Sequence, residues 1–287
     1  MSSTPNAHPT SGRLAGRVAV ITGAGNGIGR ASALRLAADG AKIVVADVLE
    51  GPASETVTLV TAAGGDAVSI VVDAASRADN EAMSQKALET YGRLDILLTA
   101  AGISHAKYRS GDIEADVKMI GANLANIETP WRTFIDLELD SWQRVIDVNL
   151  TGTLLAMQAC ADKMVDLGNG GSIITIASIA AKHPDGGPLA YTVSKAGVWM
   201  LTKKAARELA AARIRVNAIG PGYIATNMTQ LLELLPEDRQ ADLAQRIPMG
   251  RVGRPDEVAA VVSFLASDDA SYMTGTILHP DGGYFTD

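Results

Sequence analysis

A tyrosine and a lysine four positions apart form the clearest chemical pattern in the sequence. Tyr191 and Lys195 lie at the start of a long helical pattern, and residues four apart share one face of a helix. A free tyrosine has a pKa near ~10, and an ammonium ~5 Å away would stabilise the phenolate by roughly 3 kcal/mol at an effective dielectric constant of ~20. The spacing therefore indicates that Tyr191 is a general acid/base tuned by Lys195, although a packed ring beside an exposed lysine gives the same pattern.

A glycine-rich turn near the N-terminus is a candidate dinucleotide site. It follows an apolar run, 17–22, typical of a buried parallel strand, and precedes a helical pattern, 30–38. Backbone without side chains lets a pyrophosphate approach free N–H groups and the positive end of the helix dipole. The spacing is Gly-x-x-x-Gly-x-Gly and not the general Gly-x-Gly-x-x-Gly, and a tight turn without a ligand is the alternative. The residues of this predicted cradle are Gly23, Asn26, Gly27, Ile28 and Gly29.

Two aspartates follow the next two predicted strands. Asp47 stands about 20 positions beyond the glycines, where a carboxylate accepts hydrogen bonds from the adenosine ribose. It would repel a 2′-phosphate, and the glycine turn contains Asn26 but no Arg or Lys, so the sequence favours NAD over NADP. Asp73 is placed to accept a hydrogen bond from the adenine amino group. Helix capping is the alternative for both aspartates.

Strand and helix patterns alternate along the chain. Such alternation predicts an α/β fold, a single-domain, Rossmann-like, doubly wound parallel sheet of about seven strands with helices on both faces. Ligands bind at the carboxyl ends of the strands in such sheets. The expected strands are 17–22, 42–46, 67–72, 94–99, 171–177, 214–219 and 276–278, and the expected helices are 30–38, 52–63, 77–91, 140–167, 191–212 and 255–266.

Three segments stand out from this regular pattern. Residues 1–12 are polar and are expected to be a disordered tail before one domain, 13–287. Residues 103–139 are irregular, and loops this long are usually functional or disordered, so we expect a partly helical insertion near the substrate site. Asn149 interrupts an otherwise apolar helix face, which is mildly unfavourable and suggests a kink or an ordered water.

Composition limits the partners. The chain has 287 residues and a formal net charge of -7, which argues against binding to nucleic acid or to an anionic membrane surface. No apolar run approaches the ~18 residues of a membrane span. Cys160 is the only cysteine, which excludes an internal disulfide and a thiolate metal cluster, and the four histidines lack metal-ligand spacing. We therefore expect a cytoplasmic protein with a small-molecule partner and no metal.

Several motifs occur together in one order along most of the chain, from Leu14 to Gly283. They are Thr22-Gly23-x-x-x-Gly27-Ile28-Gly29, Asp73, Ala100-Ala101-Gly102, Asn149, Ser178, Tyr191-x-x-x-Lys195 and Pro221-Gly222. This set resembles the classical short-chain dehydrogenase/reductase family. One departure is that Thr99-Ala100-Ala101-Gly102 stands where the family usually has Asn-Asn-Ala-Gly, which weakens any role for those side chains.

The resemblance implies an NAD(P)-dependent oxidoreductase with four catalytic residues. Tyr191 would exchange a proton with the substrate oxygen, and Ser178 would hydrogen-bond that oxygen. Lys195 would bind the nicotinamide ribose and lower the phenol pKa, and Asn149 would hold a water on the proton path. Family members often form homotetramers, so one is expected here. The further cofactor contacts implied are Ala101, Gly102, Pro221, Gly222, Ile224 and Thr226.

Three functions are therefore compared below. The leading one is NAD(H)-dependent interconversion of a secondary alcohol and a ketone, with the substrate unidentified. The second is a 3-oxoacyl thioester reductase of the ketoacyl-carrier-protein type, which would use NADPH. The third, from a different class, is a non-catalytic dinucleotide-binding regulatory protein, since a fold does not dictate a function.

Overall fold

A parallel sheet forms the centre of the computed structural model, which describes residues 12–108, 110, 129–184, 186–229 and 245–285. Within these ranges the sheet has seven strands in the order β3-β2-β1-β4-β5-β6-β7, and every neighbouring pair is parallel. The predicted doubly wound fold is confirmed. The strands are β1 (Val18–Thr22), β2 (Lys42–Asp47), β3 (Asp66–Val71), β4 (Ile96–Thr99), β5 (Gly171–Ile176), β6 (Ile214–Ile219) and β7 (Ile277–Leu278).

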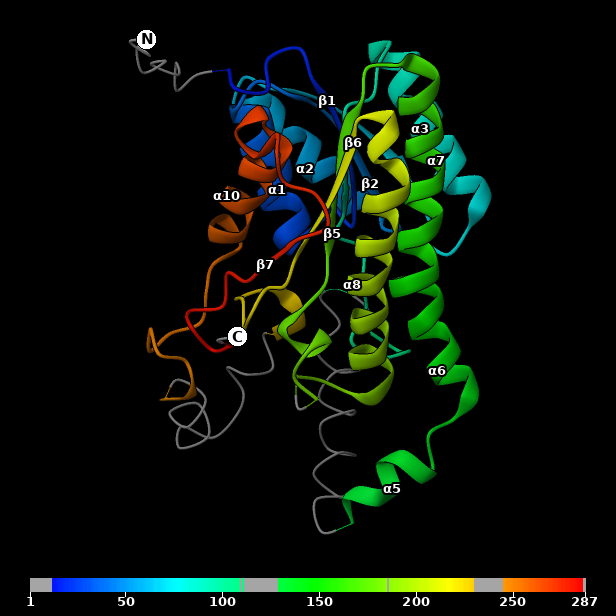
Figure 1. Cartoon of the computed structure of the whole chain (residues 1–287), viewed down its shortest axis with the longest axis vertical. Helices are drawn as coiled ribbons and strands as arrows, with labels where there is room; N and C mark the ends of the chain where they lie inside the picture. Colours follow the sequence, from blue (N-terminus) through cyan, green and yellow to red (C-terminus); the bar gives the residue numbers. More distant parts are fainter. Residues whose placement is uncertain (1–11, 109, 111–128, 185, 230–244, 286–287) are drawn as a thin grey trace.

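Helices cover both faces of the sheet (Figure 1). Side chains alternate along a strand, so Ile21 and Ile43 pack in one core while Val20 and Val44 pack in the other. The first core faces α1 (Gly27–Ala38), α2 (Glu50–Ala62) and α10 (Pro255–Ala266), and the second faces α3 (Arg77–Tyr91), α7 (Gly152–Leu167) and α8 (Leu189–Leu209).

The strand order reverses at β1, which creates a crevice. β1 pairs with β2 on one side and with β4 on the other, so the connections leave in opposite directions. The ends of the strands are in register, with Thr22 opposite Ala46 and Thr99, and Thr99 opposite Thr175. Ligands bind at such a switch point, outside the carboxyl ends of the strands.

The helix that carries Asn149 is interrupted by one π-helical turn. α6 (Leu139–Ile146) continues through the π turn (Asp147–Thr151) into α7. The Gly152 N–H donates to the Asp147 carbonyl oxygen five residues earlier, and π turns are frequent at functional sites. The sequence suggested a kink or an ordered water at Asn149. The structure has one extra residue in this single turn of the helix.

The predicted tail and insertion are described only in part. Residues 1–11, 109 and 111–128 lie outside the described residues. The described end of the insertion contains α5 (Pro130–Ile135), which lies beyond the start of α6 at one end of the molecule (Figure 1).

The described residues contain neither a membrane-spanning helix nor a cluster of metal-binding side chains. No described helix is both long and apolar enough to cross a lipid bilayer. No group of three His, Cys, Asp or Glu side chains is placed to hold a metal ion in the part of the chain that is described.

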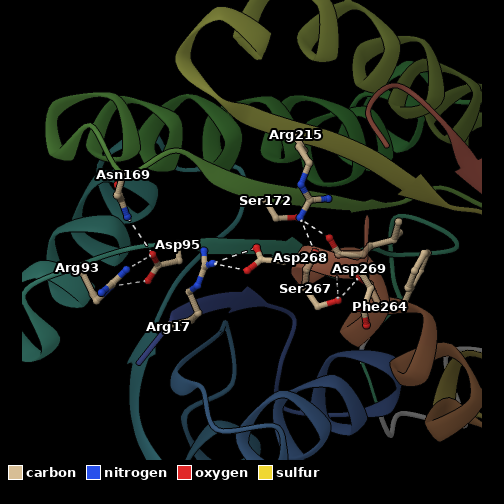
Figure 2. Close-up of polar contacts among 11 residues, drawn as sticks. Arg17, Arg93, Asp95, Asn169, Ser172, Arg215, Phe264, Ser267, Asp268 and Asp269 are labelled. Atoms are coloured by element: carbon tan, nitrogen blue, oxygen red, sulfur yellow. Dashed lines mark hydrogen bonds and ion pairs between the residues drawn. The ribbon is translucent and has the colours of Figure 1, made fainter. Parts of the chain in front are cut away.

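A buried carboxylate joins three elements at the amino end of the sheet (Figure 2). Asp95 is 1% exposed. Its Oδ2 accepts the Val18 N–H at 2.8 Å, and its two oxygens accept both arms of the Arg93 guanidinium at 2.8 and 2.6 Å. Oδ1 also accepts Asn169 Nδ2 at 2.9 Å. The carboxylate therefore ties the start of β1 to the segments before β4 and β5.

Replacing Asp95 by Ala is expected to lower the free energy of unfolding by about 3 kcal/mol, because breaking a buried pair leaves its partners without an acceptor. Asp268→Ala is the control, because that aspartate also pairs with an arginine, Arg17, but has an 84% exposed side chain. The control should change stability by less than about 1 kcal/mol. Urea unfolding measures the free energy of unfolding of both variants. Equal losses in the two would contradict the role of Asp95 in joining these elements.

Candidate active site

The glycine turn after β1 packs too closely against its neighbours to carry side chains. Gly23 and Gly27 have positive φ angles of 64° and 52°, a region that L side chains rarely adopt. A Cβ on Gly29 would lie 2.2 Å from the Gly23 carbonyl oxygen, and one on Gly27 would lie 3.3 Å from Thr226 Cγ2. The turn opens directly into α1, whose N-cap residue Asn26 makes no side-chain capping bond. Bare backbone at a helix N-terminus fits a pyrophosphate.

Asp47 lies at the end of β2 and holds the neighbouring backbone. Its Oδ2 accepts the Gly25 N–H at 2.8 Å, and its Oδ1 accepts the Leu49 N–H at 3.0 Å. The capping alternative is not met, because Leu49 is the N-cap residue of α2 and the helix has no side-chain capping bond. Each carboxylate oxygen keeps a further lone pair, so a ribose hydroxyl can still be accepted.

Asp73 lies just beyond the end of β3 and is also partly committed to the backbone. Its Oδ1 accepts the Ala75 N–H at 2.9 Å, while its own N–H donates to Asp79 at 2.9 Å. Its Oδ2 is 3.8 Å from Nη1 of Arg144 on α6. Asp73 therefore acts as a turn residue and faces a cation that the sequence did not indicate.

A single cleft of about 510 Å³ joins these elements at the carboxyl ends of the strands. It is lined by every residue of the predicted cofactor site and by Ser178. Asn149 is the predicted site residue that does not line it. The segments after β4 and β6 also line the cleft, with Ala101, Gly102, Pro221, Gly222, Ile224 and Thr226.

Ser178 and Tyr191 meet in this cleft. Ser178 lies two residues beyond β5, where its Oγ accepts the Ala180 N–H at 3.1 Å. Tyr191 is on the first turn of α8 and hydrogen-bonds the Ser178 side chain. Burial raises the pKa of the Tyr191 phenol, and the bond from Ser178 acts in the opposite direction.

Lys195 shares the same face of α8 but turns its ammonium toward β5. Nζ donates to the Ile176 carbonyl oxygen at 2.8 Å and lies 5.7 Å from the centre of the Tyr191 ring. Burial lowers the pKa of Lys195 to about 8. Desolvation is the largest cause of the upward shift of the Tyr191 pKa, and a lowering of that pKa by Lys195 stays a prediction.

Asn149 lies behind the cleft, fully buried in the π turn. Its Oδ1 accepts the Ile103 N–H at 2.8 Å, and Nδ2 donates to the Ile103 carbonyl at 3.0 Å and to Ser194 Oγ at 3.0 Å. Ser194 Oγ in turn donates to the Tyr191 carbonyl oxygen at 2.6 Å. Both amide hydrogens are therefore used, so the side chain braces the segment after β4 against the start of α8.

Comparison with known proteins decides the family. A family model described as short chain dehydrogenase matches residues 17–234. The chain belongs to this family. It is an oxidoreductase that acts on CH–OH groups, as its named relatives are.

Relatives of this short-chain dehydrogenase cover nearly its whole length. It is 35% identical over 271 residues to the 3-oxoacyl-[acyl-carrier-protein] reductase FabG of Thermotoga maritima, covering 94% of this chain and 98% of that protein. It is 37% identical over 271 residues to the cis-4-hydroxycyclohexanecarboxylate dehydrogenase of Sinomonas cyclohexanicum, covering 94% and 97%. A crystal structure of a short-chain type dehydrogenase/reductase from Mycobacterium marinum superposes with a TM-score of 0.80 at 34% identity, covering 96% and 97%.

The short-chain dehydrogenase cleft contains residues that sequence reasoning missed. Gly25 was not singled out; it does not line the cleft, but a Cβ there would lie 2.8 Å from Asp47 Oδ2, so it sets the position of that carboxylate. Tyr108 and Ser110 line the cleft from the insertion, and Asn227 Nδ2 donates to Ser110 Oγ at 3.0 Å. Gly25 could have been identified because it lies within the glycine motif. The contact between Ser110 and Asn227 joins distant segments, and no local sequence pattern predicts it.

Thr99, which stands where the family usually has asparagine, is buried at the end of β4 in this short-chain dehydrogenase. Thr99 is 3% exposed, and its Oγ1 has no hydrogen-bond partner among the described residues. The neighbouring Thr22 Oγ1 instead accepts the Ala101 N–H at 3.2 Å. A threonine of β1 thus fixes the end of β4.

Proposed function

We propose that this short-chain dehydrogenase interconverts a secondary alcohol and a ketone with NAD(H), using Tyr191 as the acid/base. The observation that carries the proposal is the meeting of Ser178 and Tyr191 in the cleft that also contains the glycine turn. A proton donor and a second hydroxyl at one point suit an oxygen that changes charge during the reaction.

The chain's own residues would hold the dinucleotide along the carboxyl edge of the sheet. Gly23, Gly27 and Gly29 would hold the pyrophosphate, Asp47 the ribose hydroxyls, and Ile224 and Thr226 the nicotinamide end. When bound, the nicotinamide supplies or accepts the hydride. The bare backbone of the turn and the position of the cleft at the switch point support this fit.

Ser178 and Tyr191 would act on the substrate oxygen. In the reducing direction the oxygen gains alkoxide character, so the Ser178 hydroxyl stabilises it and the Tyr191 phenol gives it a proton. In the oxidising direction the phenolate takes that proton. Asn149 and Ser194 are positioning residues, since they hold the first turn of α8 against Ile103.

The charge pattern supports NAD(H) as the cofactor. Asp47 lines the cleft, and its carboxylate would repel a 2′-phosphate on a ribose bound there. The basic residues that line the described cleft are Arg144 and Lys195, and both are engaged, with Asp73 and with the Ile176 carbonyl.

Replacing Asp47 by Ala should raise the kcat/KM for NADPH relative to NADH by at least about tenfold. A unit charge ~4 Å away contributes about 1 kcal/mol even in water, and the phosphate carries nearly two charges. Asp66→Ala, a change at the opposite end of the neighbouring strand, is the control and should leave the ratio unchanged. A wild-type preference for NADPH would refute the Asp47 argument.

A 3-oxoacyl thioester reductase that uses NADPH is the second candidate, favoured by the 35% identity to the Thermotoga maritima reductase. A panel that pairs each cofactor with cyclic secondary alcohols, linear secondary alcohols and a 3-hydroxyacyl thioester separates the two. Turnover of the thioester alone, and only with NADP⁺ as the hydride acceptor, would replace the leading proposal.

The proposal extends to the surroundings of the site and to the assembly. The insertion would form a wall of the substrate site, supported by the cleft-lining positions of Ile103, Ala106, Tyr108 and Ser110. By family expectation the enzyme would be a cytoplasmic homotetramer, and light scattering of the eluted protein tests the assembly.

A further inference from the structure

One arginine lies at the adenosine end of the cleft. Arg144 lines the cleft from α6, and its Nη1 is 3.8 Å from Asp73 Oδ2. Its side chain is 48% exposed and that of Asp73 is 42% exposed, so the pair lies where the cleft meets solvent. An exposed pair of this length contributes little to stability, which leaves the position of Arg144 unexplained by folding alone.

The helix places Arg144 beside a second cleft-lining residue. Val148 follows Arg144 by four positions and also lines the cleft. Residues at this spacing lie on one side of a helix, so α6 and the π turn present an aliphatic surface and a guanidinium to the same space. Asp73 is fixed opposite them by Ala75 and Asp79.

The order of the strands assigns each part of a dinucleotide to one region. The glycine turn follows β1, Asp47 ends β2 and Asp73 follows β3, and these strands are neighbours in the order β3-β2-β1. A pyrophosphate at the glycine turn and a ribose at Asp47 leave the base beyond β3, where Arg144 stands. The Asp73 carboxylate beside Arg144 makes that place unsuitable for a phosphate and suitable for a neutral ring.

We propose that Arg144 is a further cofactor-binding residue whose guanidinium lies against the adenine ring. This inference rests on the proposed dinucleotide function. A planar guanidinium stacks on aromatic faces, adenine is a planar aromatic ring, and the ion pair with Asp73 holds the guanidinium in place. Asp73 then positions Arg144 in addition to any contact of its own with the base.

The test compares Arg144→Gln and Arg144→Lys by titrating the full-length, cofactor-free protein with NADH and following nicotinamide fluorescence. Arg144→Gln should raise the Kd for NADH and for NADPH by the same factor, about three- to fivefold, with kcat within about twofold of wild type. Arg144→Lys keeps the charge without the planar group and should show most of the same loss. Reduced nicotinamide mononucleotide lacks the adenine, so its binding should be unaffected by either variant.

Arg132→Gln is the matched control, because Arg132 is an exposed α5 arginine that pairs with Asp136. Its Kd for NADH should equal that of wild type. An unchanged Kd in Arg144→Gln, or an equal loss of the mononucleotide, would overturn the inference and leave the proposed function intact. Weaker binding of NADPH alone would indicate that Arg144 contacts a 2′-phosphate, and this result would also overturn the inference. If the wild-type protein binds neither dinucleotide, the proposed function fails.

Discussion

Replacing Tyr191 by Phe is expected to lower kcat at least about a thousandfold while the Kd for NADH stays nearly unchanged. The change removes one oxygen, the atom that exchanges a proton with the substrate, and positioned proton transfer contributes about 10²–10⁴-fold. The ring remains to pack at the start of α8, so the cleft keeps its shape. Steady-state turnover and fluorescence titration with NADH measure the two quantities separately.

The control for this prediction is Tyr108→Phe, which removes a phenol oxygen from another wall of the same cleft. Its kcat should fall by less than about tenfold, because Tyr108 is not a predicted proton donor. Unaltered turnover in Tyr191→Phe would remove Tyr191 from the mechanism. Loss of NADH binding instead of turnover would make the ring a cofactor contact.

Replacing Lys195 by Met should have the second-largest effect, a fall in kcat of at least about a hundredfold. The ammonium is the buried cation nearest the Tyr191 ring, and its Nζ would lie 3.4 Å from a Cβ on Gly102. Met has a similar length without the charge. A Lys195→Arg variant keeps the charge, and recovery of turnover there would show that charge alone is required.

The same variant changes how stability depends on pH. Burial lowers the pKa of Lys195 from 10.5 in the unfolded chain to about 8. Between these values the unfolded chain binds one more proton than the folded protein, so the free energy of unfolding rises with pH, by about 3 kcal/mol across the window. This rise should be present in wild type and absent in Lys195→Met. Urea unfolding at pH 7.5 and pH 10 gives the difference, and parallel profiles would contradict it.

The sheet and its helices could be predicted because each element has a local signal. β1 is a short apolar run, α3 ends at Gly92 in the left-handed conformation, and the helices repeat apolar residues at helical spacing. β4 was expected to begin at 94 but begins at Ile96, although the Asp95 backbone still hydrogen-bonds with Val18 and Ser172. The cleft residues followed from motifs on strand ends, which the parallel topology brings together.

The remaining features depend on contacts between distant segments. The sequence placed an ammonium beside the Tyr191 phenol, but it did not show that Nζ would turn to the Ile176 carbonyl and that desolvation would dominate. It identified Asn149 without revealing its bonds to Ile103 and Ser194. Arg144 is an ordinary charged residue on a helix until the fold brings it beside Asp73, so no pattern in the sequence singles it out.

The π turn also determines what the preceding helix presents to the cleft. Each residue turns an α-helix by about 100°, so the extra residue between Asp147 and Thr151 rotates α6 relative to α7 by that angle. A single deletion there would restore an unbroken α-helix while α7 kept its packing on α3. Arg144 would then swing away from Asp73, so the position of this arginine in the cleft depends on the length of this one turn.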